Sequence, residues 1–490
     1  MTIKPFFRDV VLTFITEMAV LASFFLLYRL IAQYFGPQGV GEYSLVKRAA
    51  GMIQPLLLLG LGVGITRYVA ISVSPERKMA FFKSGVVGVM IIAGLFLIAA
   101  NIFQKEFAYF FLGSADFVSL VAPFSFFIGG LLMHSLIYSF FRGMMVSGYF
   151  NILQLLNISI LPVFAFIFFS ESSIGSAICF IGFLTGAFSV ALFCFYAKGY
   201  FFRAVSLRPF WRELFLYSLP RCAGDILYGA LFFLGPAAAA HFGSAVEAGY
   251  LSLAQGLVMA LGSLIAPLGL VLLPKISGMI AQGKKNEIAD GVNLLFTAIF
   301  HIGIFISFQA MIFADVAVKI WLGAEFLPAV PIVRILFFSA MFYCFYAASV
   351  SILNASKNKP IDTTNLFSAI VFFIFLAGAA LFILPIFPPT VSLACVFSAT
   401  IIFLGILAYR SVREIYPQKI TRDLFCVAAA LAVNLPLAII SLSIKPFIAE
   451  NLFLTILFGV ILVAAYSVLF WFLNIRRVGQ LSVKNNQFYR

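Results

Sequence analysis

Charged side chains inside otherwise apolar segments are the residues of this sequence best suited to carry chemistry. Six of the 32 Lys and Arg residues fall inside such segments, namely Arg29, Lys47, Arg48, Arg67, Arg221 and Arg334. Of the 18 Asp and Glu residues, Glu17 and Asp225 do so clearly. An ionisable side chain at membrane depth costs at least ~2.5–3.5 kcal/mol. We therefore expect these residues to face a wet cavity, where the bases would bind an anionic ligand, above all one carrying phosphate.

A simpler alternative exists for several of the bases. Arg29 and Arg334 lie near the predicted outer ends of their segments and would equally well extend to the lipid headgroups, and Arg67 would serve as an anchor at the inner end. Headgroup contact suits Lys47 and Arg48 less well, because adjacent residues on a helix point about 100° apart and cannot share one lipid-facing direction.

A glycine-rich turn followed by a long apolar segment occurs twice in the chain. The copies are FGPQGVGEYSLVKRAAGMIQPLLLLGLGVGITRYVA (35–70) and FGSAVEAGYLSLAQGLVMALGSLIAPLGLVLLPKIS (242–277). At a constant offset of 207 residues (242 − 35), Phe35, Gly36 and Tyr43 fall on Phe242, Gly243 and Tyr250. Two related halves inside a membrane protein are typical of transporters. We expect a first six-helix lobe at 1–196, a linker at 197–212, a second six-helix lobe at 213–415, and two further helices with a basic tail at 416–490.

The same offset places Glu17 one residue from Asp225, so each half carries one acid in its first apolar segment. A carboxylate in a cavity of low dielectric constant can exchange a proton or bind sodium as the cavity opens to either side. Arg221 stands four residues before Asp225 on the same helical face, and we expect the two to pair. Chance placement of the acids, and simple neutralisation of Asp225 by Arg221, are the structural alternatives.

The composition places these residues in a membrane. Hydrophobic residues make up 63% of the 490 residues and charged residues 10%, and the mean hydropathy is +1.10. Soluble proteins contain about 25% charged residues. The net charge of +14 does not indicate nucleic-acid binding, because the bases are scattered through short loops. The predicted fold class is all-α, with helices crossing the membrane many times.

Fourteen apolar runs are each long enough to cross a bilayer, which takes ~20 residues. Their predicted limits are 11–34, 43–70, 81–103, 117–141, 149–169, 174–196, 214–240, 250–273, 291–313, 327–352, 363–384, 390–409, 424–443 and 452–473. With a cytoplasmic N-terminus, nearly all loop Lys and Arg residues fall inside, and the outer side keeps Lys105, Lys319 and Lys445. The rule that basic loops stay inside therefore predicts that both termini are cytoplasmic. Lys4 and Arg8 precede an apolar run too long for a cleavable signal peptide.

No motif in the sequence suggests an enzyme or a cofactor. A P-loop, an H-E-x-x-H motif and a nucleophile elbow in a plausible setting are all missing, and the loops are too short for an extramembrane catalytic domain. The six cysteines lie in apolar segments without a C-x-x-C pair, so neither disulfides nor a metal site is expected. His134 and His301 stand singly in different spans, where packing or pore lining is expected. The basic, aromatic linker at 197–212 would lie on the headgroup surface or serve only as a connection.

The duplicated motifs carry a resemblance to a known group. FGPQGVGEYSL, LLLLGLGVGITRYVA, FGSAVEAGYLSLAQGL and PLGLVLLPKIS resemble the polysaccharide-transporter branch of the multidrug/oligosaccharidyl-lipid/polysaccharide exporter superfamily. These are the O-antigen-type flippases, which are akin to the lipid II flippase. The resemblance covers about 1–415. It implies two lobes around a central cavity and alternating-access export of an isoprenoid-pyrophosphate-linked glycan across the cytoplasmic membrane.

The resemblance also implies roles for particular residues. Cationic residues of the first, second and seventh or eighth helices hold the pyrophosphate in that group, and Arg29, Lys47, Arg48, Arg67 and Arg221 occupy comparable helices here. The thirteenth and fourteenth spans would form a groove for the polyprenyl tail. Glu17 departs from lipid II flippases, which are arginine-rich on the first helix, and favours a general surface-glycan precursor. The implied partners are the lipid bilayer, the anionic lipid-linked glycan and glycan assembly enzymes.

Three other functions fit the sequence less well than a flippase. A cation-coupled multidrug antiporter of the same superfamily would need acids and few cations in its cavity. The predicted spans of this chain contain six bases and only two acids. A membrane glycan polymerase or ligase would need a long external loop. A scaffold without transport would not need buried charge at matched positions.

Overall fold

The computed structural model describes residues 3–197, 208–356, 361–383 and 385–486. These residues are almost entirely helical, and none of them forms a β-strand. The helices of the first half are α1 (Ile3–Leu58), α2 (Leu61–Ile71), α3 (Pro75–Ile102), α4 (Gln104–Phe107), η1 (Ala108–Leu112), η2 (Ala115–Leu120), α5 (Val121–Gly143), α6 (Ser147–Gln154), η3 (Leu155–Ile160), α7 (Leu161–Phe168) and α8 (Ile174–Ala197).

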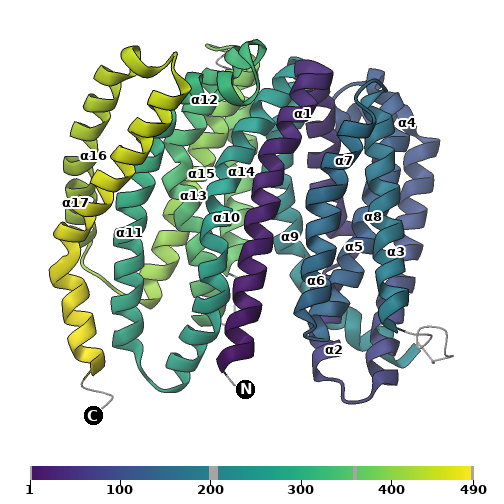
Figure 1. The fold of residues 1–490 in the computed structure, drawn as a ribbon. Helices are drawn as coiled ribbons and strands as arrows, with labels where there is room; N and C mark the ends of the chain where they lie inside the picture. Colours follow the sequence, from purple (N-terminus) through teal and green to yellow (C-terminus); the bar gives the residue numbers. More distant parts are fainter. Residues whose placement is uncertain (1–2, 198–207, 357–360, 384, 487–490) are drawn as a thin grey trace.

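The second half and the C-terminal region continue the same architecture. Their helices are α9 (Arg208–Phe242), α10 (Ala245–Ala281), α11 (Lys285–Ile312), α12 (Ala314–Trp321), η5 (Ala324–Ala329), α13 (Val330–Ser356), α14 (Ile361–Gly378), η6 (Ala379–Ile383), α15 (Pro389–Ile415), α16 (Ile420–Ile448) and α17 (Leu452–Asn486). The long helices run roughly side by side, and α1 begins at the end of the bundle where α17 ends (Figure 1). We call this end the termini side and the other the far side.

The described residues contain thirteen helices long and apolar enough to cross a membrane. The first, Val11–Leu58, has 48 residues, about twice the ~20 that one crossing needs. It holds a kink at Gly36, whose φ of 63° and ψ of −165° are not helical, so it supplies two crossings. Such a φ favours glycine, since a Cβ would be strained there. The predicted all-α fold of many membrane-crossing helices is thereby confirmed, and counting two crossings in α1 gives fourteen in the described residues.

The second predicted span, 43–70, is not one continuous helix. The chain leaves helical geometry at Leu59 and Gly60, which have φ of 49° and 69°, and resumes as α2. At Gly60 a Cβ would lie 2.4 Å from the carbonyl oxygen of Ser218 in α9. The prediction of an unbroken span is therefore wrong, because two segments approach here more closely than a side chain allows.

The fifth predicted span and the predicted linker differ in detail from the structure. The fifth span is built from α6, the π-helical turn η3 and α7, so its backbone widens at 155–160. The helix α9 begins at Arg208, inside the linker predicted at 197–212. Residues 198–207, on which the headgroup prediction rests, lie outside the described residues.

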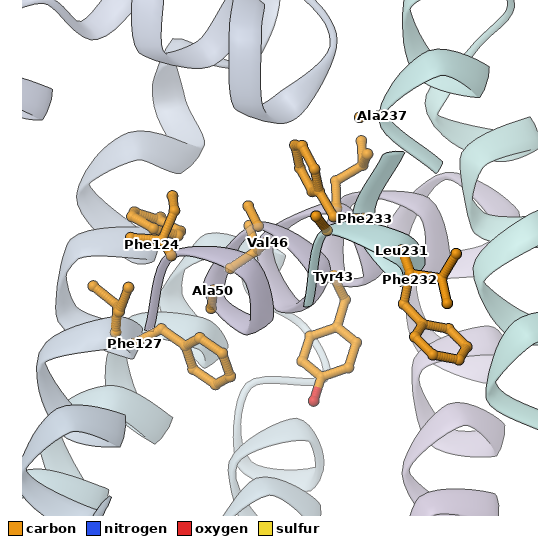
Figure 2. Packing of buried hydrophobic residues seen from close by; sticks show 14 of the residues in the cluster. Tyr43, Val46, Ala50, Phe124, Phe127, Leu231, Phe232, Phe233 and Ala237 are labelled. Atoms are coloured by element: carbon orange, nitrogen blue, oxygen red, sulfur yellow. The ribbon is translucent and has the colours of Figure 1, made fainter. Parts of the chain in front are cut away.

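The second crossing of α1 lies at the centre of the bundle. Figure 2 shows its residues Tyr43, Val46 and Ala50 between the phenylalanines of α5 and Leu231–Ala237 of α9. Val46 and Ala50 are completely buried. On the far side, a Cβ at Gly41 would lie 2.0 Å from the carbonyl oxygen of Ala245 in α10. This segment therefore contacts both halves, and it carries Lys47 and Arg48 into the middle of the molecule.

The last two helices lie at one edge of the bundle, beside α11 (Figure 1). The rings of Phe305 in α11 and Tyr466 in α17 stack with centroids 4.4 Å apart. A buried ion pair joins Arg413 of α15 to Asp423 of α16, with Nη2 2.8 Å from Oδ1. The helices α16 and α17 are thus held by both apolar and charged contacts.

Candidate substrate cavity

A cavity of about 360 Å³ lies between the two halves. Its walls come from both crossings of α1, from α5, η3 and α8 of the first half, and from α10 of the second half. The polar side chains that line it are Glu17, Ser23, Tyr28, Tyr43, Lys47, Arg48, Gln54, Asn157, Thr185 and Ser263. Three of the predicted site residues, Glu17, Lys47 and Arg48, therefore meet in one cavity.

Lys47 is held by aromatic rings. Its Nζ lies 5.3 Å from the ring centroid of Phe24, 5.4 Å from that of Tyr28 and 5.8 Å from that of Tyr43. Each cation–π contact contributes about 0.5–2 kcal/mol. Tyr28 and Tyr43 are almost fully buried, at 2% and 3% exposure. These contacts position the ammonium group without neutralising its charge.

Arg48 reaches from the first half to the second. Its Nη2 donates to the carbonyl oxygen of Ser252 at 3.0 Å, and its Nη1 lies 3.2 Å from the sulfur of Met259, both in α10. The guanidinium carbon lies 5.7 Å from the ring centroid of Phe232 in α9. In the part of the chain that the structure describes, no carboxylate forms an ion pair with Lys47 or Arg48. Two positive charges that form no ion pair there therefore line the cavity, which also holds the carboxylate of Glu17.

A second pocket, of about 580 Å³, opens on the termini side of the cavity. Gly51 and Gln54 line both spaces, so the two adjoin. Gln54 is fixed by its Nε2, which donates to Ser135 Oγ at 2.7 Å and to the carbonyl oxygen of Leu131 at 3.2 Å. The pocket, which we call the mouth, is also lined by Arg67, Arg142 and Asp225. Arg142 was not predicted as a site residue, because it lies at the end of a predicted span, where a basic residue is expected on the cytoplasmic side.

The predicted ion pair between Arg221 and Asp225 is not formed. Arg221 instead donates from Nη1 to the carbonyl oxygen of Tyr217 at 2.8 Å, and its guanidinium carbon lies 3.9 Å from the Tyr217 ring centroid. Helical spacing brought the two residues to one face, but the arginine side chain turns back along the helix to the aromatic ring. This leaves Asp225 available to the mouth.

A second acid in this region, Asp362, was missed. It lies at the start of α14, one residue before the predicted eleventh span, and a Cβ at Gly224, beside Asp225, would lie 3.0 Å from the hydroxyl oxygen of the next residue, Thr363. On α9, one turn after Gly224, the hydroxyl of Tyr228 lies 2.7 Å from that of Tyr343 in α13. Asp362 lies at the boundary between a polar loop and an apolar run. The sequence alone therefore does not distinguish it from an acid in the loop.

Arg29 and Arg334 lie away from both pockets. Arg29 donates to the carbonyl oxygens of Ile320 and Trp321 at 2.8 Å and 2.7 Å, at the end of α12 on the far side. Arg334 donates to the carbonyl oxygen of Met311 at 3.0 Å and lies 3.5 Å from Asp315. Both arginines hold elements together at the far side. Neither lines the cavity with Lys47 and Arg48.

Two neutral polar side chains of the first half, Asn157 and Thr185, also line the cavity. Asn157 of η3 donates from Nδ2 to Ser189 Oγ at 2.8 Å, and the same atom lies 3.1 Å from Nδ1 of His134. Asn157 and Thr185 both line the cavity and are each 1% exposed. His134 is therefore a packed histidine behind the wall, as one of the two predicted alternatives had it.

The chain is similar to solved structures of membrane transporters. A structure of the lipid II flippase MurJ in an inward closed conformation is 19% identical, with a TM-score of 0.70, covering 96% of this chain and 100% of that chain. An inward-facing multidrug resistance MATE family transporter of the MOP superfamily is 13% identical, with a TM-score of 0.65, covering 82% and 98%. A variant of the MATE transporter VcmN of Vibrio cholerae is 14% identical, with a TM-score of 0.57, covering 85% and 98%. At these identities the similarity shows a shared fold.

Sequence comparisons give the family directly. A search of curated proteins found no matching sequence. A family described as polysaccharide biosynthesis protein matches residues 7–280, which is more than half of the 490 residues. The resemblance drawn from the duplicated motifs is confirmed by this match together with the shared fold. The chain is therefore a multi-pass membrane protein that belongs to the polysaccharide biosynthesis protein family.

Proposed function

We propose that this protein is a flippase that exports an isoprenoid-pyrophosphate-linked oligosaccharide, such as an O-antigen or other surface polysaccharide precursor, across the cytoplasmic membrane. The observation that carries the proposal is the pair of adjacent cations, Lys47 and Arg48, against one carboxylate, Glu17, in a cavity lined by both halves of the chain. Membership of a polysaccharide biosynthesis family and the fold shared with MurJ support it. Transport by alternating access is the mechanism that a cavity between two related halves favours.

Electrostatics decide between an anionic and a cationic ligand. Two opposite unit charges 4 Å apart gain about 4 kcal/mol at an effective dielectric constant near 20, and two like charges lose as much. A ligand phosphate beside Lys47 and Arg48 would gain this energy, whereas a cationic drug would lose it. The planar guanidinium of Arg48 suits two-pronged contact with a phosphate, and Lys47 supplies a compact charge. The cavity therefore selects a phosphorylated ligand.

The dimensions of the site suit a headgroup rather than a whole lipid. The cavity of about 360 Å³ and the mouth of about 580 Å³ both fall in the range of ligand pockets, roughly 300–1,000 Å³. A pyrophosphate with its first sugars would occupy them, and the polyprenyl chain would remain in the bilayer. The edge formed by α11, α16 and α17 is our proposed path for that chain.

We place the termini side in the cytoplasm, because nearly all loop Lys and Arg residues lie there by the predicted span order. The mouth, with Arg67 and Arg142, then faces the side on which the substrate is made. Glycan assembly enzymes at the inner face of the membrane would supply it. Arg67 and Arg221 would meet the pyrophosphate first, followed by Lys47 and Arg48.

Coupling to an ion gradient or to the membrane potential is proposed for the acids. Glu17 lines the cavity, and Asp225 lines the mouth. A cation or proton taken up by these carboxylates would change the balance of charge that the substrate meets. A cation-coupled antiporter is the second candidate function, and the fold shared with MATE transporters favours it. The cavity contains two bases and one acid, and this balance of charge disfavours an antiporter of cations.

The direct test is deletion of the gene followed by measurement of lipid-linked glycan on each side of the cytoplasmic membrane. We expect the glycan to accumulate on the cytoplasmic side and to return to normal when the gene is restored. Unchanged glycan distribution together with altered resistance to cationic dyes would contradict the flippase and favour the antiporter.

Replacement of Glu17 by glutamine tests the coupling. The amide keeps the shape of the side chain but cannot carry the charge, so we expect export to fall about 5–150-fold, the usual range of coupling between two sites. The protein should still insert in the membrane. Glu106→Gln, at an exposed acid of α4, is the matched control and should export normally. Normal export by Glu17→Gln in purified, energised vesicles would remove Glu17 from the coupling machinery.

A further inference from the structure

A pocket of about 940 Å³ opens on the far side, where short turns of the two halves meet. The first half supplies Gln38, just after the kink in α1, and the helical turns η1 and η2. The second half supplies the end of α9 and the start of α10. The volume falls in the range of ligand pockets, roughly 300–1,000 Å³. We call this space the far-side pocket, and none of the predicted site residues lines it.

The far-side pocket is separate from the cavity between the halves. No described residue lines both spaces. Gln38 lines the far-side pocket, and Tyr43, further along α1, lines the cavity. Between these two residues the backbones of α1 and α10 come together, because a Cβ at Gly41 would lie 2.0 Å from the carbonyl oxygen of Ala245. A ligand of the far-side pocket would therefore bind outside the cavity.

Three exposed aromatic rings line the far-side pocket. Tyr109 and Phe110 of η1 are 51% and 64% exposed, and Phe242 at the end of α9 is 47% exposed. The ring of Tyr109 meets that of His241 edge to face, with centroids 4.8 Å apart, so a contact between the halves fixes its position. Aromatic rings at a membrane surface commonly contact lipid headgroups, but these three border one hollow. Exposed apolar side chains gathered around a pocket are typical of a binding site.

The polar side chains of the far-side pocket can both donate and accept hydrogen bonds. Ser114 Oγ donates to Oδ2 of Asp116 at 2.9 Å and accepts from the backbone nitrogen of Asp116 at 3.1 Å, so the carboxylate is held in place. Gln38, His241 and Ser244 add an amide, an imidazole and a hydroxyl. Among the described residues, no Lys or Arg lines the pocket and none forms an ion pair with Asp116. A phosphate is therefore disfavoured here, because it would meet a carboxylate and no base.

A sugar ring matches this lining. One face of a sugar ring presents C–H groups that pack against an aromatic ring, and its edge carries hydroxyls that both donate and accept hydrogen bonds. A carboxylate such as that of Asp116 can accept from two neighbouring hydroxyls, and the amide of Gln38 and the hydroxyls of Ser114 and Ser244 can donate. A lipid ammonium group would use the rings and Asp116 only, because it offers no acceptor to these donors.

We propose that the far-side pocket binds a sugar unit of a surface glycan, with the ring of Tyr109 against the face of the sugar and the Asp116 carboxylate accepting from its hydroxyls. The identification of this glycan with the exported one, and of the far side with the outside of the cell, rests on the proposed function. The protein then contacts its substrate through two sites of opposite chemistry. The cavity with Lys47 and Arg48 suits the diphosphate, and the far-side pocket suits uncharged sugars.

Saturation-transfer difference NMR tests the pocket, because it detects weakly bound sugars by their own C–H protons. The sample is the purified full chain in lipid nanodiscs prepared without sugar-based detergent. The probe is the oligosaccharide that mild acid releases from the surface polysaccharide of cells carrying this gene, treated with phosphatase. Without phosphate, the probe lacks the group that the cavity cations would bind. Titration with the oligosaccharide gives its dissociation constant.

We expect saturation transfer to the ring C–H protons of the oligosaccharide. Tyr109→Ala and Asp116→Ala should each raise the dissociation constant about ten-fold, which corresponds to about 1.4 kcal/mol. Tyr109→Phe keeps the ring and Asp116→Asn keeps an acceptor oxygen, so both should retain most or part of the binding and guard against misfolding of the alanine variants. Phe103→Ala is the matched control, because this ring is 59% exposed at the end of α3 on the same side but does not line the pocket. Its dissociation constant should equal that of the unaltered chain.

Three results would overturn the sugar site. The first is no saturation transfer from the unaltered chain to the oligosaccharide. The second is a dissociation constant that both Tyr109→Ala and Asp116→Ala leave unchanged, which would place the sugar elsewhere on the protein. The third is saturation transfer to choline chloride that Asp116→Ala removes, with none to the oligosaccharide, which would assign the pocket to a lipid headgroup.

The export assay separates this inference from the proposed function. Normal export by a chain that binds no oligosaccharide would leave the flippase standing and remove the sugar site. Oligosaccharide binding that depends on Tyr109 and Asp116, in a protein whose deletion leaves the glycan distribution unchanged, would support the sugar site and remove the flippase.

Discussion

Export of lipid-linked glycan by Arg48→Ala is expected to fall about 30-fold to a few thousand-fold. Truncating one partner of a buried, hydrogen-bonded charge pair costs about 2–5 kcal/mol, and each 1.4 kcal/mol is a factor of ten. Arg48 would make such a pair with the substrate phosphate, and it also joins α1 to α10 through Ser252 and Met259. Its loss removes both the grip on the ligand and a contact between the halves.

The measurement is transport of a polyprenyl-pyrophosphate-linked glycan into proteoliposomes, normalised to inserted protein. Arg48→Lys should retain part of the activity, because the charge remains but the planar fork is lost. Arg410→Ala is the control: this arginine is 77% exposed and pairs with Glu414 on the surface, where an ion pair contributes little. Equal export by Arg48→Ala and Arg410→Ala would show that the cavity does not hold the pyrophosphate.

The second large effect is expected on stability. Asp423→Ala should destabilise the protein by about 3–5 kcal/mol, because it leaves Arg413 buried without its partner. Both side chains are 10% exposed, and the Tyr409 hydroxyl also donates to Asp423. Arg413 is further held by Asn293 Oδ1 of α11, 2.5 Å from its Nη1. The pair therefore fastens α16 to α15 and α11.

Thermal unfolding in detergent, followed by protease access to the segment between α15 and α16, measures this effect. The double variant Arg413→Met/Asp423→Leu should be more stable than Asp423→Ala, since replacing a whole buried ion pair with apolar side chains is often neutral or better. If the double variant were as unstable as Asp423→Ala, then packing, and not the burial of an unpaired charge, would determine the stability of the contact between α15 and α16.

Hydropathy alone determined the fold class. A lipid environment demands that every backbone polar group be satisfied within its own helix, so long apolar runs translate directly into spans. The kink at Gly36 also followed from sequence, because a glycine-rich turn lay between two such runs. The break at Leu59 and Gly60 did not, since it depends on the approach of Ser218 from a segment more than 150 residues away.

The central cations could likewise be found from sequence. Lys47 and Arg48 are adjacent on a helix, so at least one of them had to point into the protein. Glu17 followed from the repeat. The structure brings all three together around one cavity.

The partners of the other charges were decided by the tertiary structure. Arg29 and Arg334 lie beside carbonyl oxygens on the far side, and Arg221 turns to Tyr217 in place of Asp225. The physical reason is the range of each interaction. Burial in lipid and helical periodicity act along the chain and can be read from it, whereas the direction of a long charged side chain depends on which helix packs beside it.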